Sequence, residues 1–234
     1  MPKYQKDPLD LIGGDMAYVE TYEHCLRIAK ENNHTDMNII LFPGSFSPFT
    51  DGHFSLVLKY LLAAKKKGIE VDQVKILMSM KERDGISPRV VCSFISQVYS
   101  NDKRVKVIAC KQSPVREVYE EVQDRSNLGN TYILARSNKD NDQVVSDFYK
   151  NFSKGGKYWY EGCKVVKLDV DADPLVCKGR TDEHNGEPVS GTIAREDIKD
   201  NDLDNFMALY KLILMQGTVT KRHIKQYFEA LKKK

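Results

Sequence analysis

The stretch Met37-Asn-Ile-Ile-Leu-Phe-Pro-Gly-Ser-Phe-Ser-Pro-Phe-Thr-Asp-Gly-His53 decides how this sequence folds. Residues 37–42 form a short apolar run rich in strand-favouring residues, and Pro43-Gly44 ends the run. The pattern predicts a buried strand followed by a glycine-containing loop. Leucines then recur on one side of residues 52–67, which predicts a helix that stops near Gly68.

The same alternation of strand and helix continues along the chain. Further strands are expected over residues 74–80, 105–110, 131–135 and 163–170, and helices over residues 88–99, 114–123 and 143–152. This order predicts an α/β protein with a Rossmann-like, doubly wound, parallel five-stranded sheet covered by helices on both faces. Such a sheet binds its ligand at the carboxyl ends of the strands, where the strand order switches.

Three segments are expected. Residues 1–35 would form an arm and an N-terminal helix over residues 16–30, and residues 36–200 would form the α/β domain. Residues 201–234 would form a C-terminal helical extension packed on that domain. Apolar spacing predicts one helix over residues 204–215 and a last helix that begins at Thr220, with Gly217 between them.

The composition excludes several classes of protein. The 234 residues include 36 basic and 33 acidic side chains, a net charge of +3, which is too balanced to indicate nucleic-acid binding. The five cysteines are scattered and form no C-x-x-C pair, so we expect free thiols and neither disulfides nor a zinc site. No segment has the roughly 18 apolar residues of a membrane span, and no secretory signal is evident. A cytoplasmic protein without a membrane partner is the expectation.

The loop over residues 44–53 has the chemistry of an anion site. Gly44 allows the backbone to lie close to a ligand, and Gly52 leaves room where the next helix begins. Helix N-terminal amides attract anions, and Thr50 and His53 add side-chain donors there. Donors aimed at a phosphate stabilise the charge that develops in phosphoryl or nucleotidyl transfer. Taken alone, the loop also fits a simple strand–turn–helix junction with a structural histidine.

A second loop has similar features. In Val189-Ser-Gly-Thr-Ile-Ala-Arg-Glu-Asp197, Ser190 is a natural N-cap for a helix, and Arg195 can present a fork of donors to a phosphate. A capped surface helix with a solvated arginine is the competing interpretation.

Together, the two loops resemble the HxGH nucleotidyltransferase (cytidylyltransferase-like) superfamily. Residues 42–57 are similar to its first motif, in the T-x-G-H form of the phosphopantetheine adenylyltransferases, and residues 189–195 are similar to its second, S-G-T-x-x-R. The resemblance implies that Thr50 and His53 bind a triphosphate and stabilise the transition state, and that Arg195 clamps the phosphates. Ser47 departs from the pattern, because the family commonly has an aspartate there.

The expected site can be stated residue by residue. The catalytic candidates are Thr50, His53, Lys81 and Arg195. The nucleotide-binding candidates are Gly44, Ser45, Phe46, Gly52, His53, Arg136, Ser190, Gly191, Thr192 and Arg195. The acceptor-binding candidates are Ser45, Ser47, Lys81 and Arg83. Lys81 and Arg83 follow the second strand and Arg136 ends the fourth, so all three are expected at the ligand edge of the sheet.

Other polar and aromatic residues are expected to be structural. The basic segment 178–180 is expected to be a mobile loop, although it could face phosphate. His184 is expected in a turn and not in a metal site. The aromatic residues 158–160 are expected to pack against the sheet.

The resemblance implies an enzyme that moves AMP from ATP to a phosphorylated small-molecule acceptor, of the phosphopantetheine or nicotinamide mononucleotide type, and releases pyrophosphate. Mg²⁺ would arrive on the triphosphate, and no protein metal site is expected. A cytidylyltransferase that uses CTP and a phosphorylated alcohol is an alternative. A nucleotide-binding regulator without catalysis is another, supported by Ser47. A class I aminoacyl-tRNA synthetase fits less well, since the chain is short and lacks a basic RNA surface. A homo-oligomer remains open.

Overall fold

The computed structural model describes residues 36–136, 142–170 and 174–232. The expected N-terminal helix over residues 16–30 lies outside this part of the chain.

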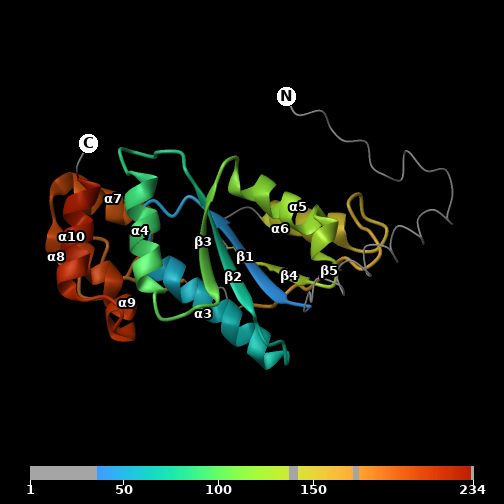
Figure 1. The fold of residues 1–234 in the computed structure, drawn as a ribbon. Coiled ribbons are helices and arrows are strands. Elements are labelled where there is room, and N and C mark those ends of the chain that lie inside the picture. The colour runs from blue at the N-terminus through green and yellow to red at the C-terminus, as the bar shows by residue number, and fades with distance from the viewer. Residues whose placement is uncertain (1–35, 137–141, 171–173, 233–234) are drawn as a thin grey trace.

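The centre of the molecule is a five-stranded sheet in which every strand is parallel to its neighbours (Figure 1). Its strands are β1 (Asn38–Gly44), β2 (Gln73–Ser79), β3 (Val105–Cys110), β4 (Thr131–Leu134) and β5 (Lys164–Val165), in the order β3-β2-β1-β4-β5. The chain runs from β1 outwards to β3 and then crosses to β4 on the other side of β1. The expected Rossmann-like, doubly wound α/β fold is confirmed, and the strand order switches between β1 and β4.

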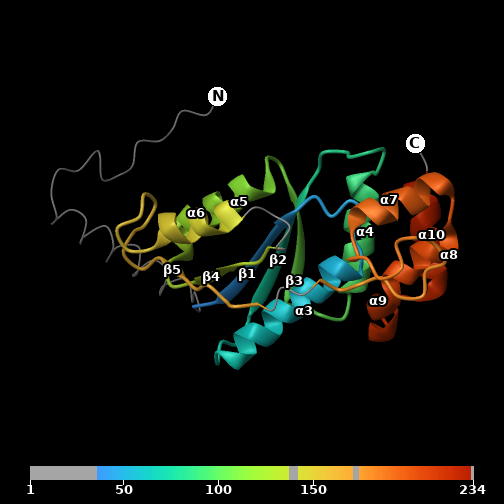
Figure 2. The same cartoon turned by 180° about the vertical axis from the view of Figure 1, so that it is seen from behind.

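Helices cover both faces of the sheet (Figures 1 and 2). The helices α3 (Asp51–Lys66) and α4 (Pro88–Val98) lie on one face, and α5 (Pro114–Gln123) and α6 (Asp142–Phe152) lie on the other. The short 3-10 helix η1 (Arg125–Asn127) leads into β4. Since side chains alternate along a strand, Ile40 of β1 packs in the α3/α4 core and Ile39 in the α5/α6 core. This two-sided burial explains why β1 is apolar throughout.

The fifth strand is shorter than expected. A strand over residues 163–170 was the expectation, but only Lys164–Val165 pairs with β4. The hydroxyl of Tyr149, on α6, accepts from the Leu134 amide at 3.0 Å and donates to the Val166 carbonyl, also at 3.0 Å. A side chain therefore satisfies the backbone groups that a continued strand ladder would have paired.

The helix expected over residues 204–215 is wrong as a single element. The chain after α7 (Gly191–Asp200) forms α8 (Leu203–Met207), the 3-10 helix η2 (Ala208–Tyr210) and α9 (Lys211–Gln216), and α10 (Lys221–Leu231) follows. The break falls at Tyr210, whose φ and ψ of −128° and 24° are not helical. Asp51 accepts hydrogen bonds from the Leu212 and Ile213 amides, which a continuous helix would have bonded to its own carbonyls.

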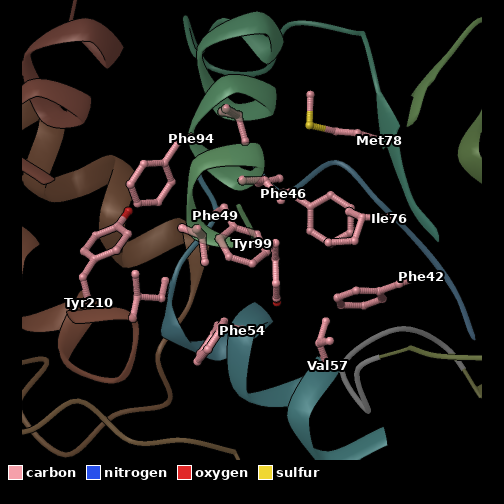
Figure 3. Packing of buried hydrophobic residues seen from close by; sticks show 14 of the residues in the cluster. Phe42, Phe46, Phe49, Phe54, Val57, Ile76, Met78, Phe94, Tyr99 and Tyr210 are labelled. Atoms are coloured by element: carbon pink, nitrogen blue, oxygen red, sulfur yellow. The ribbon is translucent and has the colours of Figure 1, made fainter. Parts of the chain in front are cut away.

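The C-terminal helices share one core with α3 and α4. Phe206, Tyr210 and Phe228 are fully or almost fully buried there. Figure 3 shows Tyr210 beside Phe94 of α4, with Phe46 and Phe49 of the glycine loop directed into the same aromatic core. The loop is therefore held by its own side chains as well as by its backbone. In the part of the chain that the structure describes, no helix is long and apolar enough to cross a bilayer.

Candidate functional site

A cavity of about 380 Å³ opens at the carboxyl end of β1, where the strand order switches. Both loops that the sequence singled out contribute to it. The described residues that line it are Phe42, Pro43, Gly44, Ser45, Phe46, Ser47, Gly52, His53, Leu56, Arg83, Arg136, Gly191, Thr192 and Arg195. Among these residues none is acidic and three are arginines, so the cavity has the charge of an anion site.

Two glycines bring the two loops into contact. A Cβ atom at Gly52 would lie 2.7 Å from the Val189 carbonyl oxygen, and one at Gly191 would lie 3.0 Å from the Ser47 carbonyl oxygen. Each loop thus places a glycine against the backbone of the other. As a result the N-terminal ends of α3 and α7 meet at one cavity, although Gly52 and Ser190 are 138 positions apart in the sequence.

Alanine at Gly52 or Gly191 is expected to push the two loops apart, and by more where the added Cβ would lie closer to the backbone of the opposite loop. Gly52→Ala should lower the free energy of unfolding by about 1–3 kcal/mol, because backbone must move. Gly191→Ala, with the longer contact, should have a smaller effect. Chemical denaturation measures both changes. A Gly52→Ala protein as stable as wild type would contradict this contact.

His53 is held in one orientation. Its Nδ1 accepts a hydrogen bond from the Thr50 backbone amide at 3.2 Å and lies at the same distance from the Thr50 hydroxyl. The imidazole stacks on Phe49, with ring centroids 5.5 Å apart, and meets Phe46 edge-on at 5.4 Å. Since Nδ1 is the acceptor for a main-chain N–H, the neutral ring carries its proton on Nε2. A neutral His53, which is one of the residues lining the cavity, therefore carries its N–H donor on Nε2.

Thr50 and Ser190 occupy the N-cap positions of α3 and α7. Thr50 is fully buried and precedes α3, and the Ser190 hydroxyl accepts from the Ile193 amide at 3.4 Å as the N-cap of α7. Neither is among the described residues that line the cavity. Both shape the helix ends whose amides face the ligand edge.

Phe46 and Gly44 depend on each other. Phe46 has a φ of 50°, an unfavourable value for a non-glycine residue, and its ring is almost fully buried. A Cβ at Gly44 would lie 2.8 Å from that ring. Gly44 therefore makes space for an aromatic anchor of the loop. Strain held in place by packing is common where a loop must keep a functional shape.

Arg195 connects three segments around the cavity. Its guanidinium donates to the Ser47 carbonyl at 2.5 Å and to the Thr192 hydroxyl at 3.2 Å, and it pairs with the Asp84 carboxylate at 2.9 Å. Burial and the nearby Arg83 lower the pKa of the Arg195 guanidinium, although Asp84 opposes the shift. The group remains protonated, since an arginine pKa starts above 12. Asp84, which is largely exposed, is the anion that Arg195 holds in this structure.

Of the remaining candidates, Arg83, Arg136 and Ser47 line the cavity and Lys81 does not. Arg83 and Arg136 do so as expected from their places after β2 and β4. The backbone of Arg136 is held by Tyr60, whose hydroxyl accepts from the Arg136 amide at 3.2 Å. Lys81 is exposed at the same edge of the sheet but outside the described lining. Ser47 is buried, and its carbonyl is the acceptor for Arg195.

Asp51 is a buried residue of the loop that the sequence did not single out. The residue is 2% exposed, and its carboxylate accepts from the Leu212 amide at 2.7 Å and the Ile213 amide at 3.0 Å. Burial raises the pKa of Asp51 from 3.8 to about 6, although the hydrogen bonds from these two amides and the charge of Lys211 oppose the shift. No local sequence pattern indicates a partner 161 residues away.

The titration of Asp51 predicts a pH-dependent stability. Its pKa is higher in the folded chain than in the unfolded chain, so the folded state binds the proton more tightly and stability falls as pH rises from about 4 to 6. The shift from 3.8 to about 6 corresponds to about 3 kcal/mol. Asp51→Asn removes this titration. The stability of wild type relative to Asp51→Asn should therefore decrease by that order between pH 4 and 7 in denaturant melts. A constant difference would contradict the shifted pKa.

Arg180 is the second feature that the sequence missed. The expectation of a mobile basic loop is wrong at this residue, because its side chain is fully buried. Its guanidinium pairs with Asp197 of α7 through two hydrogen bonds of 2.6 and 2.8 Å, and also contacts Asp182. It donates further to the Asn205 carbonyl at 2.9 Å. Arg180 thereby fixes the segment before α7 against α7 and α8.

The other minor candidates are structural. His184 lies between Glu187 and Glu196, with contacts of 2.9 and 3.2 Å, and the hydrogen bond to Glu187 raises its pKa. In the described ranges no group of three or more metal-ligating side chains is present. Tyr158 packs against aromatic residues of α5 and α6, and the buried Tyr160 donates to the Val122 carbonyl at 2.7 Å.

No protein-family model matches this chain, and no curated protein matches its sequence. The function must therefore be argued from the two loops and the geometry of the cavity.

Proposed function

We propose that this protein is a nucleotidyltransferase that moves a nucleotidyl group, AMP in the first instance, from a nucleoside triphosphate to a phosphorylated small-molecule acceptor. The observation that carries the proposal is the meeting of the two loops at one cationic cavity. The N-terminal ends of α3 and α7 converge there, at the switch point of a parallel sheet. Four side chains join them, those of His53, Arg83, Arg136 and Arg195. A ligand with several phosphates matches that set of donors.

The reaction that fits this site needs no covalent intermediate with the protein. An oxygen of the acceptor phosphate attacks the α-phosphorus in line, the bond from that phosphorus to the bridging oxygen breaks, and pyrophosphate leaves with the electron pair. His53 would donate from Nε2 to the charge that develops on the transferred group. Arg195 and the amides of α7 would bind the departing phosphates, and Arg83 or Lys81 the acceptor phosphate.

Mg²⁺ is proposed to accompany the triphosphate. The described cavity lining supplies cationic, hydroxyl and amide groups and no carboxylate. Phosphate oxygens and water would therefore be the ligands of Mg²⁺, which commonly keeps several waters. The ion would neutralise part of the charge on the phosphates.

The proposal is tested by pyrophosphate release. ATP and CTP are each offered with phosphopantetheine, nicotinamide mononucleotide and a panel of phosphorylated alcohols, with Mg²⁺ present. We expect release with ATP and one acceptor class above the rate without acceptor. Release with CTP only would identify a cytidylyltransferase. The absence of release in every combination would overturn the enzymatic proposal.

A nucleotide-binding regulator is the second candidate, and the contacts of Arg195 favour it. Ser47, Thr192 and Asp84 already engage this guanidinium, so it can hold the loops together without a substrate. Ser47 also replaces the aspartate typical of the family that the loop resembles. Calorimetric binding of ATP without pyrophosphate release across the panel would support this candidate.

A further inference from the structure

The C-terminal helices are attached to the glycine loop at two points. Asp51 directs one carboxylate oxygen to the Leu212 amide and the other to the Ile213 amide, both in the first turn of α9. The Phe49 amide donates to the Tyr227 hydroxyl of α10 at 3.3 Å. Residues 49 and 51 of the loop are thus bonded to two different helices of the extension.

These attachments are buried. Asp51 is 2% exposed, and Tyr227 is buried with its ring stacked on Phe94 at a centroid distance of 3.9 Å and an interplanar angle of 5°. Phe94 belongs to α4, which packs on the sheet. The two helices therefore connect the loop to the core of the α/β layer.

The attachment points lie beside the residues that line the cavity. Ser47 precedes Phe49 by two positions, and Gly52 and His53 directly follow Asp51. A displacement at residues 49–51 must therefore change the position of the His53 donor and the amides of α3. Transfer chemistry is sensitive to such changes, since a misplacement of about 1 Å can lower a rate about 100-fold.

From this geometry we propose that Asp51 is a positioning residue, through which the C-terminal helices hold the glycine loop in its binding shape. The parts of the extension that act on the loop are the first turn of α9 and Tyr227 of α10. The inference rests on the proposed function for its effect on turnover, but the mechanical link between helix and loop can be measured without substrate.

The test compares two kinds of variant in the full chain. Asp51→Asn removes one of the two acceptors at α9 with little change of shape, and Tyr227→Phe removes only the hydroxyl that holds the Phe49 amide. Thr218→Val is the matched control, because the Thr218 hydroxyl donates to the Val98 carbonyl at 2.7 Å and attaches the extension to α4 and not to the loop.

Amide hydrogen exchange is the first measurement, on protein without ligand. We expect Asp51→Asn to accelerate exchange in peptides covering residues 44–53 and 211–216 by about tenfold or more, as for the loss of a hydrogen bond to a charged group. Tyr227→Phe should show a smaller effect on the loop peptide. Thr218→Val should accelerate exchange in the C-terminal helices only. An unchanged loop peptide in both Asp51→Asn and Tyr227→Phe would overturn the proposal.

Steady-state kinetics is the second measurement. Asp51→Asn should lower kcat by about 10- to 100-fold with the KM for the nucleotide changed far less, at a temperature where the protein is fully folded. If Asp51 were merely structural, Asp51→Asn would lower the melting temperature and leave kcat unchanged. That result would also overturn the proposal. If wild type shows no turnover, the proposed reaction fails while the exchange result still decides the link. If Asp51→Asn does not fold, Tyr227→Phe decides both measurements.

Discussion

His53→Ala is expected to lower kcat by about 100- to 1000-fold, the effect of removing one preorganised donor to a developing charge. The orientation of the ring supports this size of effect. Nδ1 is occupied by the Thr50 amide, and the rings of Phe46 and Phe49 fix the plane of the imidazole. The Nε2–H donor is thus held before substrate arrives, and its loss cannot be replaced by a mobile group. Pyrophosphate release with the donor and acceptor found in the screen measures the effect.

The chain contains its own control for this substitution. Thr220 and His223 begin α10 in the same way that Thr50 and His53 begin α3, and the His223 Nδ1 accepts from the Thr220 amide at 3.1 Å. His223→Ala therefore removes the same type of capping contact, worth about 0.5–2 kcal/mol. The helix it caps, α10, contributes none of the described residues that line the cavity. We expect normal kcat in His223→Ala.

A third variant separates capping from catalysis at residue 53. Glutamine at the third helical position can also accept from the N-cap amide, so His53→Gln should retain much of the capping contact and still carry N–H donors. Its kcat should lie between those of wild type and His53→Ala. Full activity in a well-folded His53→Ala protein would exclude the proposed role of His53 and favour the regulator.

Arg180→Ala should cause the largest loss of stability, about 3–5 kcal/mol in the free energy of unfolding. The guanidinium is fully buried and makes hydrogen bonds to Asp197, Asp182 and the Asn205 carbonyl. Its removal leaves the carboxylate of Asp197, itself 4% exposed, without its charged partner in a site shielded from water. Urea denaturation at neutral pH measures the change.

The control for Arg180→Ala is an exposed pair of the same chemistry. Arg104 pairs with Asp102 at 2.7 Å, but its side chain is 49% exposed. Arg104→Ala should change stability by less than about 1 kcal/mol, because solvent screens the pair. Replacing Arg180 with methionine and Asp197 with leucine together should recover part of the loss, since no unpaired charge then remains at Asp197. Equal effects of Arg180→Ala and Arg104→Ala would contradict the buried network.

The sequence was sufficient to predict the parts of the site that depend on neighbours within a few residues. The apolar run before Pro43 predicts β1, the leucines after His53 predict α3, and Ser190 is the N-cap of α7 as expected. Periodicity and capping act over one or two turns, so they can be found in the local pattern. The place of the cavity follows from strand alternation, because parallel strands end at one edge of the sheet.

Some site residues have positions that the local pattern could not distinguish. Thr50 and His53 are three residues apart, but Thr50 is buried outside the described lining while His53 lines the cavity. Lys81 and Arg83 are two residues apart, and only Arg83 reaches the described lining. The direction of a side chain at the end of an element depends on what packs against it, which the order of residues in one loop does not specify.

The order of residues along the chain is enough to predict the doubly wound alternation of strands and helices and the two glycine loops at the edge of the sheet. Contacts between distant segments set where α9 begins, how β5 ends and what Arg180 does. Asp51 breaks a helix 161 residues away, and Tyr149 replaces a strand ladder with its hydroxyl. The physical reason is the same in each case. A buried polar group must find a partner, and the partner becomes available only when distant segments of the chain have packed together.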